Sequence, residues 1–447
     1  MTVQSMTHRG TADQDRLAGI VGHAYRGAPY LRTKYRAAGI DPTHWSEGLF
    51  PRLPFTTKDD LRLAYPEGLL AVDRSEVAVI HESSGTTGEP TPAFFTRGDI
   101  DEWLERMLFN GVGLDEQDVV FVKTPYSMLT TAHQMHGAAQ RAGATVIPAG
   151  NRTELMPYSR ALRLLRDYRA TVAYCMPVEL MLFARRALAA GLDPAKDFPD
   201  LRAAVVNGEV LSPAKKRFLE ELWSVTLFPD YGSTETTTLG GACAAGSLHL
   251  WSDRFLFEVL DPATGQCSPR GTGELVVTSY LRRAMPIVRY RMGDIVTVTD
   301  PACACGSDRP QVWVHGREAD RFTVDGRELY PIDVEDVVYG ALLGCEPVFW
   351  SGEVDDGHLT LVLEATDSGL TEVRRRTAEL ASALASRLGM RSTIDVVPPG
   401  TQMTLDRQTE QEAMFKPVYL RMRGHDGRGL DYTGTSQETG SSQEKLT

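Results

Sequence analysis

Short apolar runs alternate with amphipathic segments through the first half of the chain. The runs have the length and β-branched content of buried strands, and they lie at 77–80, 119–122, 145–147, 171–174 and 203–206. Apolar residues recur at helical spacing over 16–38, 102–109 and 160–168. Alternation of this kind predicts an α/β fold with parallel sheets and helices packed on them.

The pattern changes after residue 255, where strand-like runs follow one another. We expect strands at 255–260, 274–278, 296–298 and 311–314, and they predict a β-subdomain at about 240–315. Further strands are expected at 321–324, 348–350 and 359–364, with helices at 332–343 and 371–388. The sequence therefore predicts a large N-terminal domain (1–315) and a small α+β C-terminal domain (316–423). Residues 424–447 contain few apolar side chains and predict a disordered tail.

The length and net charge of the chain indicate how many domains it has and which partners it is unsuited to bind. A chain of 447 residues is too long for one ordinary core. Its net charge of −12 disfavours nucleic acid or an anionic membrane as a partner. No run reaches transmembrane length, and no signal-peptide pattern is visible. We therefore expect a cytoplasmic protein without a nucleic-acid or membrane partner, and a homodimer is compatible with this expectation.

The most informative segment is the loop at 83–91, SSGTTGEPT, which follows the first strand-like run. Glycine permits positive φ and close approach of the backbone to a ligand. Exposed N–H groups and hydroxyls in such a loop form a site for phosphate. The loop lacks the Gly-Lys-Ser/Thr ending of a Walker motif. A polar turn between two strands is the alternative interpretation.

Three further motifs follow: YGSTET at 231–236, RYRMGD at 289–294 and GREADRF at 316–322. With the loop, and in this order, they resemble the acyl-adenylate-forming superfamily, most closely its phenylacetate-CoA ligase branch. The resemblance runs from about residue 54 to the low 420s. It implies ATP-dependent activation of a carboxylic acid as acyl-AMP, release of pyrophosphate, transfer to CoA, and a mobile C-terminal domain. Two alternatives stay open: transfer to an amine or other nitrogen nucleophile, and a catalytically silent nucleotide-binding regulatory protein.

The resemblance assigns nucleotide binding to residues of these motifs and of the segment after the fifth strand-like run: Ser84, Thr86, Thr87, Gly88, Gly208, Glu209, Tyr231, Gly232, Thr234, Glu235, Asp294 and Arg317. The loop residues would hold the outgoing phosphates, and Gly208 and Glu209 would lie along the adenine. Glu235 would bind Mg²⁺ as a hard oxygen ligand. Asp294 would accept hydrogen bonds from the ribose, and Arg317 would contact ribose or phosphate.

The catalytic residues implied by the resemblance are Thr86, Glu235 and Lys416. Relatives carry a lysine after a segment that resembles 398–401, but the expected short Gly-Lys segment is absent here, and Lys416 is the first lysine that follows. The chain departs from the family pattern at two other positions. Glu89 stands where many relatives have lysine, and Ala319 stands at a hinge position that is often aspartate.

Cys243, His249, Cys303 and Cys305 supply three thiols and one imidazole on either side of the predicted β-subdomain. Three cysteines and one histidine are a recurrent structural zinc set. The pattern also resembles that of zinc-bearing members of the phenylacetate-CoA ligase branch. Ordinary buried thiols and a core histidine are the alternative. We expect structural Zn²⁺ at these four residues.

In the family the carboxylate substrate lies beside the YGSTET motif, so neighbouring aromatic, methionine and polar residues are candidates for the acyl pocket: Tyr126, His136, Tyr174, Met176, Asn207 and Tyr231. Such residues suit a flat apolar ring with a few polar anchors. An aryl or aryl-alkanoic acid is therefore the expected substrate, and His136 or Asn207 could bond a ring substituent. Ordinary core packing is the alternative for each residue by itself.

Overall fold

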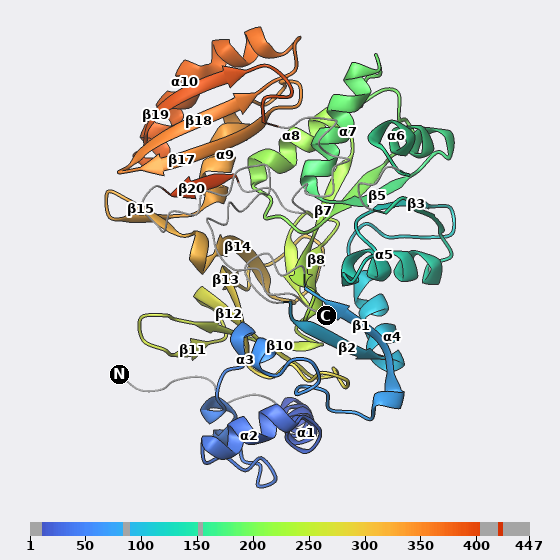
Figure 1. The fold of residues 1–447 in the computed structure, drawn as a ribbon, viewed down its shortest axis with the longest axis vertical. Helices are drawn as coiled ribbons and strands as arrows, with labels where there is room; N and C mark the ends of the chain where they lie inside the picture. The colour runs from blue at the N-terminus through green and yellow to red at the C-terminus, as the bar shows by residue number, and fades with distance from the viewer. Residues whose placement is uncertain (1–10, 84–89, 151–154, 403–418, 423–447) are drawn as a thin grey trace, which may run out of the picture.

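The computed structural model describes residues 11–83, 90–150, 155–402 and 419–422, and Figure 1 shows its fold. The predicted loop residues Ser84, Thr86, Thr87 and Gly88, together with Lys416, lie outside the described residues, as does the predicted tail. In the described part of the chain, no helix has the length and apolar character needed to span a bilayer. The predicted mixed α/β class is confirmed.

The first elements form a helical segment and a two-stranded hairpin. Their bounds are α1 Thr11–Gly27, α2 Pro29–Ala37, η1 Glu47–Arg52, α3 Lys58–Leu63, η2 Arg74–Glu76, β1 Val77–Glu82 and β2 Pro92–Thr96. The segment predicted as helical over 16–38 divides at Pro29, because proline has no N–H to donate within a continuous helix. Apolar side chains of α1 and α2 share a core with β2 and with residues 284–290.

Five parallel strands and their helices build the α/β layers. Their bounds are α4 Arg97–Met107, β3 Val119–Lys123, α5 Thr130–Arg141, β4 Thr145–Pro148, α6 Tyr158–Asp167, β5 Val172–Cys175, α7 Pro177–Ala189, β6 Ala203–Val206, α8 Pro213–Trp223 and β7 Thr226–Ser233. The strand order is β4–β3–β5–β6–β7. Helix α5 packs on one face, and α6, α7 and α8 pack on the other. Because both faces are covered, β5 and β6 are apolar along their whole length.

The strands predicted as a β-subdomain continue this sheet. They are β8 Thr237–Ala242, β9 Leu248–Leu250, β10 Phe255–Leu260, β11 Cys267–Ser268, β12 Gly271–Ser279, β13 Tyr290–Thr299 and β14 Gln311–Arg317. Strand β7 pairs in parallel with β6 and antiparallel with β8. One 12-stranded sheet therefore runs through both parts, and β7 is the strand at which its direction changes.

The C-terminal part is a small α+β unit, as predicted. Its elements are η3 Glu318–Asp320, β15 Phe322–Val324, β16 Arg327–Leu329, α9 Pro331–Ala341, β17 Phe349–Asp355, β18 His358–Glu364, α10 Leu370–Leu388, β19 Arg391–Val397 and β20 Leu420–Met422. Strands β19–β18–β17–β20 form a separate four-stranded sheet with one antiparallel pair at its centre. The boundary at residue 316 stays a prediction.

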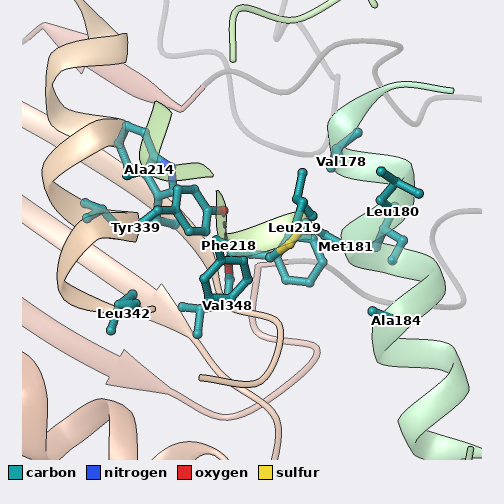
Figure 2. Packing of buried hydrophobic residues seen from close by; sticks show 14 of the residues in the cluster. Val178, Leu180, Met181, Ala184, Ala214, Phe218, Leu219, Tyr339, Leu342 and Val348 are labelled. Carbon is teal, nitrogen blue, oxygen red and sulfur yellow. Dashed lines mark hydrogen bonds between the residues drawn. The ribbon is translucent and has the colours of Figure 1, made fainter. Parts of the chain in front are cut away.

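Helix α8 lies between α7, which packs on the large sheet, and α9 of the C-terminal part. Figure 2 shows this packing. Phe218 of α8 lies against Tyr339 of α9, with ring centroids 5.0 Å apart. Leu219 of α8 and Met181 of α7 belong to the same core. The C-terminal part therefore shares a continuous apolar core with the parallel layers.

Lys215, in the first turn of α8, is fully buried at this junction. Its Nζ lies 2.9 Å from Glu335 Oε2, 3.1 Å from the Tyr419 hydroxyl and 3.3 Å from Glu209 Oε2. Glu335 also accepts the Ser212 N–H at 3.1 Å. Burial disfavours the ammonium, but the negative charge of Glu335 and its neighbours outweighs this and raises the pKa of Lys215 well above its usual value. One buried cation thus joins the parallel layers to the C-terminal part.

We expect Lys215→Met to lower the free energy of unfolding by about 3–5 kcal/mol, because it leaves buried carboxylates without their cation. The measurement is the urea midpoint followed by tryptophan fluorescence. Lys216→Met is the matched control, since the Lys216 amine pairs with Glu220 and is 25% exposed. That variant should lose less than about 1 kcal/mol. Equal midpoints for the two variants would contradict the structural role of Lys215.

Candidate active site

Glu235 is bound by Thr91, at the C-terminal end of the predicted phosphate loop. Thr91 Oγ1 donates to Glu235 Oε1 at 2.8 Å, and the Thr91 N–H donates to Ser83 Oγ at 3.1 Å. Thr91 and Glu235 are both buried. The hairpin therefore brings Thr91, which follows residues 84–90 in the sequence, to the carboxylate predicted to bind Mg²⁺, 144 residues away in the chain.

The YGSTET motif forms the turn between β7 and β8. A Cβ on Gly232 would lie 2.1 Å from the Thr237 carbonyl oxygen, so the close approach of the two strands requires glycine. The Thr236 N–H donates to Ser233 Oγ at 3.2 Å, and the Ser233 N–H donates to Thr236 Oγ1 at 3.3 Å. These bonds close the turn around Thr234 and Glu235.

Tyr231, Asp294 and Arg317 come from three separate motifs and meet at one place. The Tyr231 hydroxyl donates to Asp294 Oδ2 at 2.7 Å. Arg317 is the cross-strand partner of Asp294, and its Nε lies 3.8 Å from Asp294 Oδ1. Burial and the charge of Asp294 raise the pKa of Tyr231 well above its usual value. The phenol therefore stays protonated and acts as a donor.

Gly208 and Glu209 follow β6, and Gly208 has a φ of 84°. The Glu209 carboxylate is occupied within the protein. Its Oε1 accepts the Val178 N–H of α7 at 3.2 Å, and its Oε2 accepts the Tyr419 hydroxyl at 2.8 Å and lies beside Lys215. An adenine at this segment would therefore meet the backbone rather than the carboxylate of Glu209.

The predicted pocket residues lie around the carboxyl ends of the parallel strands, the edge at which such sheets bind ligands. Tyr174 is on β5, and Met176 and Asn207 directly follow β5 and β6. The Tyr126 hydroxyl lies 3.0 Å from His136 Nδ1 of α5. Burial raises the pKa of Tyr126 to about 12, and burial with the charge of His133 lowers that of His136. Both side chains are therefore neutral near pH 7.

A cavity of about 280 Å³ lies elsewhere, against β1 and β2, where it is lined by Glu67, Leu70, Val77, Phe94 and their neighbours. None of the predicted pocket residues lines this cavity. Proximity to the motifs, rather than this cavity, identifies the candidate acyl site.

The sequence analysis did not single out three charged residues of the structure: Lys215, Glu335 and Asp230. Asp230 directly precedes the YGSTET motif, so its position alone could have identified it. Thr238 Oγ1 donates to Asp230 Oδ1 at 2.5 Å, and burial raises the pKa of Asp230 to about 6. No local signal distinguishes Lys215 from the neighbouring Lys216.

The four predicted zinc ligands lie together. Their ligand atoms are all within 4.8 Å of one another, with Cys243 Sγ 3.7 Å from Cys303 Sγ and Cys305 Sγ 3.5 Å from His249 Nε2. His249 Nδ1 lies 2.9 Å from the carbonyl oxygen of Arg309. Because a carbonyl only accepts, Nδ1 carries the proton and the lone pair of Nε2 faces the thiols. Three thiols and one oriented imidazole fit a four-coordinate metal.

Most of the chain is similar to proteins of known family. The family model for AMP-binding enzymes matches residues 47–281. Over 337 residues the chain is 35% identical to a phenylacetate-coenzyme A ligase of Thermus thermophilus, covering 73% of this chain and 74% of that protein. Over 406 residues it is 30% identical to a phenylacetate-coenzyme A ligase of Pseudomonas putida, covering 87% and 90%.

Solved structures show the same fold at lower sequence identity. The 2-hydroxyisobutyryl-CoA ligase in its postadenylation state superposes with a TM-score of 0.80 at 22% identity, covering 92% of this chain and 89% of that one. The same ligase in its thioesterification state gives a TM-score of 0.65. The predicted resemblance is thus confirmed. The chain belongs to the AMP-binding enzyme family, as an AMP-forming ligase of the phenylacetate-CoA ligase-like branch.

Proposed function

We propose that this protein activates an aromatic carboxylic acid with ATP and transfers the acyl group to CoA. In the first half-reaction a carboxylate oxygen bonds to the α-phosphorus of ATP, and pyrophosphate leaves. In the second, the CoA sulfur bonds to the acyl carbon, the thiol proton passes to solvent, and AMP leaves. The curated relatives are CoA ligases by name, and they favour this reaction over an amine acceptor or a silent nucleotide-binding protein.

One observation carries the proposal: two carboxylates from distant motifs, one in the β7–β8 turn and one on β13, are each held by a hydrogen bond from another motif residue or loop end. Thr91 holds Glu235, and Tyr231 holds Asp294. Glu235 would bind Mg²⁺, which neutralises phosphate charge as pyrophosphate leaves. Asp294 would accept the ribose hydroxyls. The remaining assignments of Ser84, Thr86, Thr87, Gly88, Thr234, Arg317 and Lys416 belong to the same proposal.

The aromatic character of the acid is proposed from the pocket residues. Tyr126, Tyr174 and Met176 supply apolar surface that suits a flat ring. The cytoplasmic location and the homodimer also stay predictions.

We also propose that Cys243, His249, Cys303 and Cys305 hold one Zn²⁺. With four protein ligands the coordination is complete, so the ion would stabilise β8, β9 and the segment before β14 rather than take part in the reaction. The support is the closeness of the ligand atoms and the orientation of His249 by Arg309.

Glu235→Gln should lower turnover at least about tenfold, because it removes the charge proposed to hold the metal. The measurement is acid-dependent ATP–pyrophosphate exchange, with identification of AMP as the product nucleotide. Glu105→Gln is the control, since Glu105 is half-exposed and forms an ion pair with Arg254, away from the candidate site. ADP and phosphate as products would refute the proposed reaction.

Asp294→Ala should weaken ATP binding roughly tenfold to a hundredfold, since hydrogen bonds to a charged group contribute about 1.5–3 kcal/mol. Tyr231→Phe removes a neutral donor and leaves the carboxylate, so its effect should be smaller. The measurement is the dissociation constant of ATP at saturating Mg²⁺. An unchanged constant in Asp294→Ala would exclude the ribose role.

Protein purified without chelator should contain one Zn²⁺ per chain by elemental analysis. Cys303→Ser should lose the metal and lower the melting temperature, because a structural metal contributes to folding. Cys345→Ser removes a buried cysteine outside the cluster and should keep the metal. Metal-free wild-type protein, or metal retained in Cys303→Ser, would be evidence against the site.

A further inference from the structure

Three polar side chains at the candidate acyl site are buried without a hydrogen-bond partner among the residues that the structure describes. They are Thr124, Tyr174 and Asn207, with exposed fractions of 1%, 0% and 4%. The two hydroxyls are unpaired, and so are both polar atoms of the Asn207 amide. Buried polar groups in native proteins are usually satisfied, and each exception needs a specific explanation.

The sheet register brings these three residues together. Val122 pairs with Tyr174 and Tyr174 with Val205, while Lys123 pairs with Cys175 and Cys175 with Val206. Thr124 and Asn207 are the residues that directly follow β3 and β6. Because side chains alternate along a strand, the alternation continued by one residue assigns both to the face of Tyr174. This is the face covered by α5, which carries His136.

Asp230 adds a part-buried carboxylate on the neighbouring strand. Phe228 of β7 pairs with Val205 of β6, and Asp230 is two residues further along β7, on the same face. The negative charge of Asp230 contributes, after burial, to the raised pKa of Tyr174. The region thus offers hydroxyl, amide and carboxylate groups on one face of the sheet. Arg106, whose positive charge acts on Asp230, is itself paired with Glu102.

This polar cluster lies at the edge where parallel sheets bind ligands, and Asn207 directly precedes the predicted adenine segment at Gly208. If these unpaired polar groups had no role besides core packing, they would only lower the stability of the fold. The same groups are satisfied if the bound acid presents donors and acceptors to them. A carboxylate-like second substituent is disfavoured, because Asp230 would repel it.

We infer that the aromatic acid carries a neutral hydrogen-bonding ring substituent, a hydroxyl or an amino group, which is bound by Asn207 and Tyr174. This inference rests on the proposed function and specifies its substrate class. Sites built to hydrogen-bond a substrate hydroxyl or amino group discriminate strongly against analogues without it, because their own polar groups are then left unpaired. A methyl-substituted acid fills similar space without such bonds and is the matched comparison.

The test is ATP–pyrophosphate exchange by the full chain with benzoic and phenylacetic acids, each unsubstituted or with a hydroxyl, amino or methyl group at each ring position. The wild-type protein should give its highest kcat/KM with a hydroxyl or amino acid, at least about tenfold above the methyl acid of the same position. Asn207→Leu and Tyr174→Phe should each reduce this ratio toward one, mainly through KM, with little loss for the methyl acid.

Tyr35→Phe is the control, because it also removes a fully buried hydroxyl without a partner, but in the α1–α2 core. It should leave the ratio unchanged, and melting temperatures report whether each variant folds. If unsubstituted or methyl acids are preferred while AMP and pyrophosphate are still formed, the inference is wrong and the proposed function stands. If no acid supports exchange, the proposed function and the inference both fail.

Discussion

The arrangement of the two parts of this protein depends on the buried ammonium of Lys215. Burying one charge is unfavourable unless its partners are placed accurately. Here one partner, Glu209, is near in the sequence, and the other two, Glu335 and Tyr419, come from distant segments. The apolar contacts of α8 with α7 and α9 are tolerant of small shifts, whereas this network is not. The hydrophobic core therefore provides most of the free energy that holds the C-terminal part against the parallel layers. The Lys215 network determines the position in which the two parts pack.

The continuous sheet explains why the motifs converge. Strand β7 is parallel to β6 on one side and antiparallel to β8 on the other, so the carboxyl ends of the parallel strands and the β7–β8 turn share one edge. Tyr231 is near the end of β7 and reaches Asp294, which is on β13. A separate β-subdomain would not fix this distance, but strands of one sheet do.

The hydrophobic pattern allowed the fold class and most strands to be predicted from sequence, and the motifs allowed Glu235, Asp294 and Arg317 to be named as candidate site residues. The partner of Glu235 is Thr91, and such a contact across 144 residues follows only from the packed hairpin. Lys215 and Lys216 have the same local sequence environment, yet Lys215 is fully buried and the Lys216 side chain is 25% exposed. Burial of this kind is determined by α9, which lies more than a hundred residues later, and periodicity within α8 cannot reveal it.

Glu209 connects the candidate site at the end of β6 with the Lys215 network. One carboxylate oxygen accepts an N–H at the start of α7, where a negative charge is favoured by the helix dipole, and the other faces Lys215 and Tyr419. The same residue follows Asn207 and Gly208 at the end of β6. A displacement of this segment by a bound nucleotide or acid would change the distances within the Lys215 network. Glu209 therefore belongs both to the segment that ends β6 and to the network that joins the C-terminal part to the parallel layers.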